Sequence, residues 1–294
     1  MVKILIFFLL ALMVYYSIYY FPDLYRHRKE KDGNFAIGAV IGLITDFLDT
    51  LGIGSYAPTT LLLDFTHQLD NDRKLPGTLN VAHSIPCIIE GIIFMTVVKV
   101  SPVTLFSMVI AAIIGSWVGS KTVTKLSEQK VQFYVGIALI ITAVLMVARQ
   151  MGWLDVLGVG NTATALTGIK LVIGVVGNFI LGMLMTIGVG LYAPCMAMVY
   201  MLGLSPLVAF PIMMGSCAGL MPVASVNFIK TGDYARQVSF GITIGGLVGV
   251  FIAAKFVTNM NLSVLTWIII VIVLYTGASY IVKSRKTAKA NASK

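Results

Sequence analysis

Long apolar runs separated by short polar segments recur along the whole chain. Most of them are close to the roughly 20 residues that a helix needs to cross the hydrocarbon layer of a membrane. The pattern predicts an all-α, multi-pass protein of the inner (plasma) membrane, with apolar segments at 4–21, 35–66, 77–98, 102–120, 131–148, 169–202, 206–229, 237–257 and 263–282.

Two of these runs do not have the length of a simple crossing. The first, taken to residue 68, would be about 50 Å long as one helix, against a hydrocarbon core near 30 Å, yet it is too short for two crossings. Glycine and proline interrupt it at Gly52–Pro58 (GIGSYAP) and interrupt the second long run at Gly188–Pro194 (GVGLYAP). We therefore expect each run to break into two half-length helices, which form either a re-entrant hairpin or one discontinuous crossing.

The two breaks belong to a longer internal repeat. Ungapped alignment at an offset of 136 residues gives 10 identities over the 21 positions 38–58. Internal duplication in an all-helical membrane protein is typical of a transporter. We expect two tandem homologous repeats, and the predicted organisation is an N-terminal transmembrane helix with a basic cytoplasmic loop (1–33), repeat 1 (34–150), a linker (151–168), repeat 2 (169–283) and a basic cytoplasmic tail (284–294).

Composition and charge agree with a membrane location. Hydrophobic residues make up 58% of the chain and charged residues only 11%, whereas about a quarter of a soluble domain is charged. Much of the net charge of +9 lies in Arg26–Lys31 and Lys283–Lys294, which flank apolar segments, so we exclude nucleic acid as a partner. An inverted arrangement of the repeats, with both opening runs re-entrant, places more Lys and Arg on the cytoplasmic side than a parallel one does.

Small residues outside the breaks indicate packing rather than chemistry. The run Gly241-x-x-x-Gly245-x-x-x-Gly249 predicts a surface for close helix packing. The three cysteines lie in apolar segments and form no Cys-x-x-Cys pair, so we expect no metal site and no cofactor.

Two tandem units that each open with a Gly-rich break and a proline resemble the TauE/SafE family of sulfite exporters, in the TSUP superfamily of 4-toluene sulfonate uptake permease-like proteins. The segment Pro76–Asn80 resembles the family's small-residue and Asn signature, and the Gly115-x-x-x-Gly119 and Gly245-x-x-x-Gly249 helices are similar to its fourth elements. Family members often have three glycines in the break, where this chain has Gly-x-Gly, so it resembles a divergent bacterial member. The resemblance covers about 35–283. It implies a secondary transporter, an exporter or permease, for a small sulfur oxyanion, organosulfonate or other organic anion, with proton coupling.

The two breaks are the predicted substrate site. Helix N-termini present unpaired N–H groups and a partial positive charge, and glycine lets a ligand approach the backbone closely. The alternative is that the breaks are kinks for close packing. We expect the breaks to bind a small anion. The residues predicted to contact it there are Gly52, Gly54, Ser55, Tyr56, Gly188, Gly190 and Tyr192. Asn80, Ser216 and Asn227 are expected as further hydrogen-bond donors.

Four ionisable residues in the first copy are candidates for proton coupling. Asp46 and Asp49 share a face of the half-helix before the first break, and His83 and Glu90 lie on one polar stripe. Ionisable groups at membrane depth are functional candidates, and histidine titrates near neutral pH. The alternatives are a solvated helix end for the aspartates and an internal hydrogen-bonded pair for His83 and Glu90.

An intramembrane hydrolase is the alternative function, with Ser55 as nucleophile and His83 as base. Ser55 aligns with Leu191 in the second copy, and hydrolysis does not explain the duplication. We therefore predict a transporter and not an enzyme, whose partners are a small anion, protons and the lipid bilayer. The sequence leaves the oligomeric state open.

Overall fold

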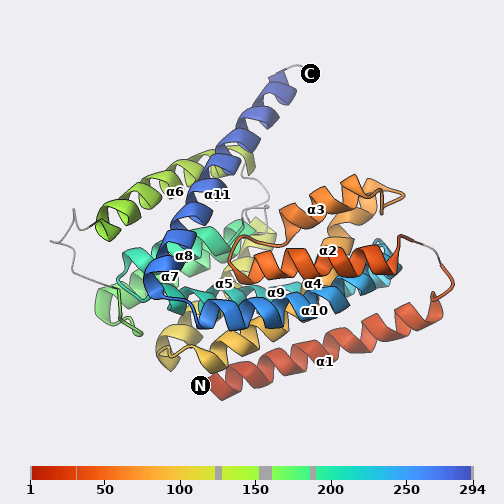
Figure 1. Cartoon of the computed structure of the whole chain (residues 1–294), viewed down its shortest axis with the longest axis horizontal. Helices are drawn as coiled ribbons and strands as arrows, with labels where there is room; N and C mark the ends of the chain where they lie inside the picture. The colour runs from red at the N-terminus through yellow and green to blue at the C-terminus, as the bar shows by residue number, and fades with distance from the viewer. Residues whose placement is uncertain (1, 31, 123–127, 152–160, 186–189, 293–294) are drawn as a thin grey trace. The chain divides into compact units, whose positions relative to one another are not determined.

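The computed structural model describes residues 2–30, 32–122, 128–151, 161–185 and 190–292 (Figure 1). Over these residues the regular secondary structure is helical, turns and loops join the helices, and one isolated bridge pairs Ala163 with Leu204. The helices are α1 (Val2–Arg26), α2 (Phe35–Thr50), α3 (Tyr56–Phe65), η1 (Asp72–Lys74), α4 (Leu75–Val97), α5 (Pro102–Thr122), α6 (Glu128–Gln150), α7 (Gly168–Met185), α8 (Tyr192–Met201), η4 (Pro206–Val208), α9 (Ala209–Thr231), α10 (Arg236–Thr258) and α11 (Leu262–Ala292).

Seven helical segments of the described chain are long and apolar enough to cross a membrane. They confirm the prediction of an all-α, multi-pass protein. The helices on either side of the first break, α2 with 16 residues and α3 with 10, are shorter than a crossing. The seven segments are Val2–Arg26, Leu75–Val97, Pro102–Gly119, Gly168–Met185, Pro206–Thr231, Arg236–Thr258 and Leu262–Arg285.

The first break interrupts the helices where the glycines predict, and the described residues of the second, Gly190 and Leu191, are also non-helical. The first lies between α2 and α3, and there Gly52 and Gly54 have φ values of 93° and 91°, a region that glycine enters without a steric penalty. The second lies between α7 and α8; residues 186–189 fall outside the described chain, and Gly188 is among them. Pro58 and Pro194 are each the third residue of the helix after the break, where a missing N–H leaves no helical hydrogen bond unmade.

The chain divides into two compact units, and each takes helices from both halves of the sequence. The first unit comprises residues 1–97 and 217–259, which include α1 to α4 and α10. The second comprises residues 98–216 and 260–294, which include α5 to α8 and α11. Each unit is described below by itself.

Close packing of α2 against α10 forms the centre of the first unit (Figure 1). A Cβ atom added at Gly42 of α2 would lie 2.1 Å from the backbone oxygen of Ile242, and one at Gly245 of α10 would lie 1.8 Å from that of Ala39. Both distances are far below van der Waals contact, so only glycine fits at these positions. The predicted packing surface on α10 is confirmed, and α2 is the helix that it binds.

The second unit repeats this kind of contact between α5 and α7. A Cβ atom added at Gly115 of α5 would lie 2.0 Å from the oxygen of Phe179, and one at Gly182 of α7 would lie 2.1 Å from that of Ala112. In the same unit α6 lies along α11 (Figure 1). Glycine therefore sets the backbone separation in the central helix pair of each unit.

Helix α1 docks onto α4 one turn before its internal proline, Pro86. Pro86 has no N–H, so the carbonyl of Ala82, one turn earlier, loses its helical donor. The hydroxyl of Thr243 on α10 donates to that carbonyl at 2.8 Å, and the buried hydroxyl of Tyr16 on α1 donates to the carbonyl of Val81 at 2.8 Å. Thr243 thus replaces the donor that Pro86 lacks, and Tyr16 adds a hydrogen bond from α1 to the neighbouring carbonyl.

Ion pairs fix the end of α1 to the start of α10. Arg236 pairs with Asp23 at 2.8 Å and with Glu30 at 2.9 Å. Asp32 accepts the backbone N–H of Arg236 at 2.6 Å, which caps the N-terminus of α10. Burial raises the pKa of Tyr234, and its hydroxyl therefore stays protonated and donates to Asp23 at 2.5 Å.

We expect Gly42→Ala to destabilise the protein, because its methyl group would collide with the α10 backbone, which cannot move aside as a side chain can. Overpacking of this kind costs about 1–3 kcal/mol. Thermal unfolding of the purified protein in detergent measures the effect. Gly177→Ala is the matched control, because its Cβ meets only the flexible side chain of Met198, at 2.3 Å; equal losses in the two variants would contradict the account.

Candidate functional site

Three helices of the first unit meet at a buried histidine. Nδ1 of His83 on α4 lies 2.8 Å from Oδ1 of Asp46 on α2, and the two side chains are 0% and 1% exposed. Nε2 of His83 lies 3.0 Å from the hydroxyl of Thr59 on α3. An ionised carboxylate can only accept, so Nδ1 carries the hydrogen of the first contact. This geometry brings together Asp46 and His83, which the sequence predicted separately.

A second polar contact joins α2 to α4. The hydroxyl of Thr50, the last residue of α2, is hydrogen-bonded to Oε1 of Glu90 and lies 2.8 Å from the backbone oxygen of Asp46. Oε2 of Glu90 and Oδ2 of Asp46 are buried without a hydrogen-bond partner among the described residues. Glycine also makes room here, because a Cβ atom added at Gly246 of α10 would lie 2.1 Å from Oδ2 of Asp46.

The first break borders this cluster. Asp49 is buried, and its carboxylate interacts with the backbone and the hydroxyl of Ser55, the N-cap residue of α3. The hydroxyl of Tyr56 donates to Oδ1 of Asn80 at 3.0 Å. A Cβ atom added at Gly54 would meet nothing within 4 Å, so the backbone of the break faces open space there. Thus the structure gathers the predicted residues of the first break within one unit.

The second break has different surroundings, which belong to the second unit. The backbone N–H of Gly190 donates to the hydroxyl of Tyr280 on α11. Ser216 donates to the backbone oxygen of Ile212 at 2.7 Å and accepts from the amide of Asn178 at 3.2 Å. Tyr192 is the first residue of α8.

Sequence reasoning missed several of these polar residues. Asn178 is a buried amide in an otherwise apolar stretch of α7, a signal that could have identified it. Thr50 and Thr59 each lie four residues from a named candidate, Asp46 and Ser55, but threonine is ordinary in membrane helices. No local pattern marks Tyr280.

Two residues predicted from the sequence, Asn227 and His83, are not placed as expected. The side chain of Asn227 is exposed on α9. The two ring nitrogens of His83 contact Asp46 and Thr59, so His83 is not placed as a base for Ser55. The nucleophile and base that a hydrolase requires are therefore not paired.

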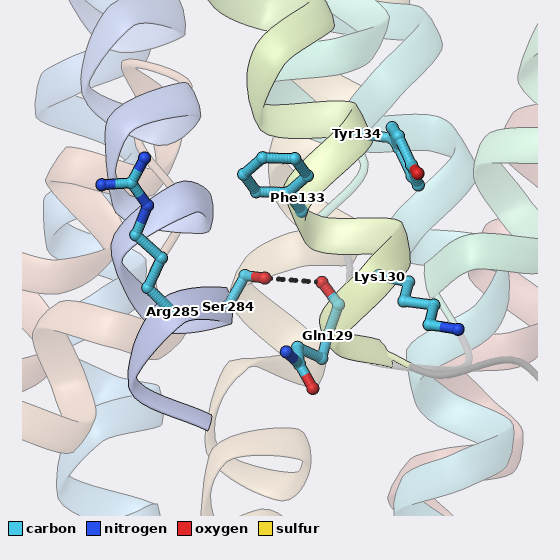
Figure 2. A pocket seen from close by; sticks show the side chains of 6 residues that line it. All are labelled: Gln129, Lys130, Phe133, Tyr134, Ser284 and Arg285. Atoms are coloured by element: carbon cyan, nitrogen blue, oxygen red, sulfur yellow. Dashed lines mark hydrogen bonds between the residues drawn. The ribbon is translucent and has the colours of Figure 1, made fainter. Parts of the chain in front are cut away.

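A surface hollow of about 320 Å³ lies in the second unit, between α6 and α11. Figure 2 shows its lining and the hydrogen bond from Ser284 to the backbone oxygen of Gln129, at 2.8 Å. The two cationic side chains in its wall, Lys130 and Arg285, point away from each other. They do not converge as they would on a small bound anion.

Comparison with known proteins gives one match. A family model described as sulfite exporter TauE/SafE matches residues 1–146. The match includes α1, which the sequence resemblance had left outside, and ends within α6. No curated protein and no solved structure matches the chain.

We expect Asp46→Ala to destabilise the protein strongly, because it leaves the buried imidazole of His83 without its partner. Breaking a buried pair on one side costs about 3–5 kcal/mol. Thermal unfolding is again the measurement, and Asp64→Ala, the same change at an exposed position of α3, is the control. If Asp46→Ala unfolds at the temperature of the control, the pair does not support the fold.

Proposed function

We propose a function on the premise that the chain belongs, over residues 1–146, to the sulfite exporter TauE/SafE family, a family of membrane transporters and not of enzymes. The protein is a secondary transporter of a small anion, a sulfur oxyanion or an organosulfonate. Transport is coupled to protons, and the protein lies in the inner (plasma) membrane.

The observation that carries this proposal is the buried ionisable cluster beside an open helix break. Asp46, His83 and Glu90 are each 0% exposed, and His83 and Glu90 lie in α4, which is long and apolar enough to cross a membrane. Charged groups there are costly, and they are found where ions or protons move. Asp46, Asp49, His83 and Glu90 are therefore the proposed proton-coupling residues.

The first break offers donors to an anion without any basic side chain. No Lys or Arg lies between Gly52 and Tyr56 or between Gly188 and Tyr192. Unpaired N–H groups at the N-terminus of α3 supply the positive potential, and Gly54 leaves the backbone accessible. Tyr56, Ser55 and Asn80 add side-chain donors in the first unit. Gly190, Tyr192 and Ser216 are the proposed site of the second break, and Asn227, which is exposed on α9, is not part of it.

Asp49 links protons to the anion at this break. Its carboxylate interacts with Ser55 at the start of α3, where a substrate anion would bind. The ionised Asp49 carboxylate and a substrate anion would repel each other at the N-terminus of α3. The substrate therefore binds when Asp49 is protonated, because the backbone and hydroxyl donors of Ser55 are then released to the anion. Anion and proton are thus bound together.

The proposed internal repeat also favours a transporter. After α1 the described chain has two successive sets of five α-helices, α2 to α6 and α7 to α11. Helices α3 and α8 each have 10 residues, and α4 and α9 each have 23. The first helix of each copy packs against the fourth helix of the other, as α2 with α10 and α7 with α5. We propose two inverted repeats, 34–150 and 169–283, with the N-terminal helix, linker and basic tail at the boundaries predicted above.

A thermal-shift panel tests the anion site. Purified protein is heated with sulfite, a short alkanesulfonate, acetate or chloride, and a specific ligand raises the melting temperature by mass action. We expect sulfite or the sulfonate to stabilise the native protein. We expect Gly54→Val to abolish the shift, because a β-branched side chain fills the space in front of the backbone donors.

Gly168→Val is the matched control, since Gly168 also has a positive φ, 54°, and open space around its Cβ but lies at the start of α7, away from both breaks. A folded Gly54→Val variant that keeps the full anion shift would place the site elsewhere. Where Gly54→Val does not fold, Gly54→Ala gives the same comparison with less strain.

A further inference from the structure

Glu90 is buried in the middle of α4, inside a segment long enough to cross the membrane. Its Oε1 atom is hydrogen-bonded to the hydroxyl of Thr50, and its Oε2 atom has no hydrogen-bond partner among the described residues. An ionised carboxylate with an unpartnered oxygen is strongly disfavoured in such surroundings. A neutral carboxylic acid, which has one hydrogen to donate, needs fewer partners.

The hydrogen bonds of the Thr50 hydroxyl also favour a protonated Glu90. Its Oγ1 atom is in hydrogen-bonding contact with two oxygens, Oε1 of Glu90 and the backbone oxygen of Asp46, the latter at 2.8 Å. A hydroxyl has a single hydrogen, and a backbone carbonyl can only accept. If Glu90 were ionised, both acceptors would have to share this single hydrogen, which weakens each contact.

We propose that Glu90 is protonated in this conformation and donates its hydrogen to Oγ1 of Thr50, whose own hydrogen is donated to the backbone oxygen of Asp46. Each of the three oxygens then has a complementary partner. This protonation state is inferred from the contacts of Thr50 together with the burial of Glu90 and its unpartnered Oε2 atom; its role in transport rests on the function proposed above.

The charges around Glu90 favour the neutral form. Asp46 and Asp49 on α2 are the acidic groups that act on it, and His83 on its own helix is already bound to Asp46. The neighbouring helix α10 has its cationic residues, Arg236 and Lys255, only in its first and last turns. The buried titratable side chains of α1 are the phenols of Tyr16 and Tyr20. No described cation offsets a further negative charge.

Loss of this proton acts on the first break. With Glu90 ionised, Thr50 has one hydrogen for two acceptors, and the charged carboxylate is the stronger acceptor. The hydroxyl then turns from the backbone oxygen of Asp46 to Glu90. Thr50 is the last residue of α2, two residues before Gly52, so the change falls where α2 enters the break. Protonation of Glu90 thereby controls the end of the helix that presents Asp46 and Asp49.

Infrared difference spectroscopy of the protein in lipid at neutral pH tests this inference without any transport assay. We expect Glu90→Gln to remove a carbonyl stretch of a protonated carboxylic acid, a band that shifts on deuteration. Glu30→Gln, the same change at a surface residue paired with Arg236, should instead remove bands of an ionised carboxylate. Loss of only carboxylate bands in Glu90→Gln would overturn the proposal.

Thermal unfolding is the second measurement. The amide of Glu90→Gln can donate to Thr50 as the acid does, so we expect it to retain the native melting temperature, whereas Glu90→Ala lowers it. If Glu90→Gln does not fold under conditions in which the native protein does, residue 90 does not donate a hydrogen bond to Thr50, and the proposal is wrong. If no anion binds but the acid band is present, the protonation of Glu90 stands and the proposed function fails.

Discussion

Backbone contact between α2 and α10 is the constraint on which the first unit depends. Helix α2 has 16 residues, about 24 Å at 1.5 Å per residue, and cannot cross a hydrocarbon layer of about 30 Å. A helix that ends inside the membrane leaves backbone groups unpaired unless protein or water satisfies them. The glycines of the two helices let α10 hold α2 at the smallest possible separation, and α2 in turn presents Asp46 and Thr50 to α4.

The close contact between α2 and α10 also makes room for the carboxylate of Asp46. Gly246 of α10 faces Oδ2 of Asp46, so a larger residue there would expel the carboxylate that holds His83. In the second unit α5 and α7 also approach closely at glycines. The neutral amide of Asn178 is buried there and donates hydrogen bonds to Ser216 and to the backbone oxygen of Met108. The four proposed proton-coupling residues therefore all lie in the first unit.

Helix positions and the breaks could be predicted from the sequence because they depend on local properties. Apolar length predicts the crossings, and Gly52, Gly54 and Pro58 predict where the first long run divides. The acidic face of α2 and the polar stripe of α4 were also visible. Their partners were not, because Thr50, Thr59 and Tyr280 acquire a role only when helices approach each other. The contact of α2 with α10 joins residues about 200 apart, which no spacing rule connects.

Simultaneous measurement of anion and proton movement tests the account most directly. Purified protein is reconstituted into liposomes that contain a pH-sensitive dye, and sulfite uptake is followed together with internal pH under an imposed anion gradient. The account predicts that the anion gradient alone drives protons in the same direction. It also predicts that Asp49→Asn uncouples the two movements while anion flux continues. Anion flux that leaves the internal pH unchanged in the native protein would contradict it.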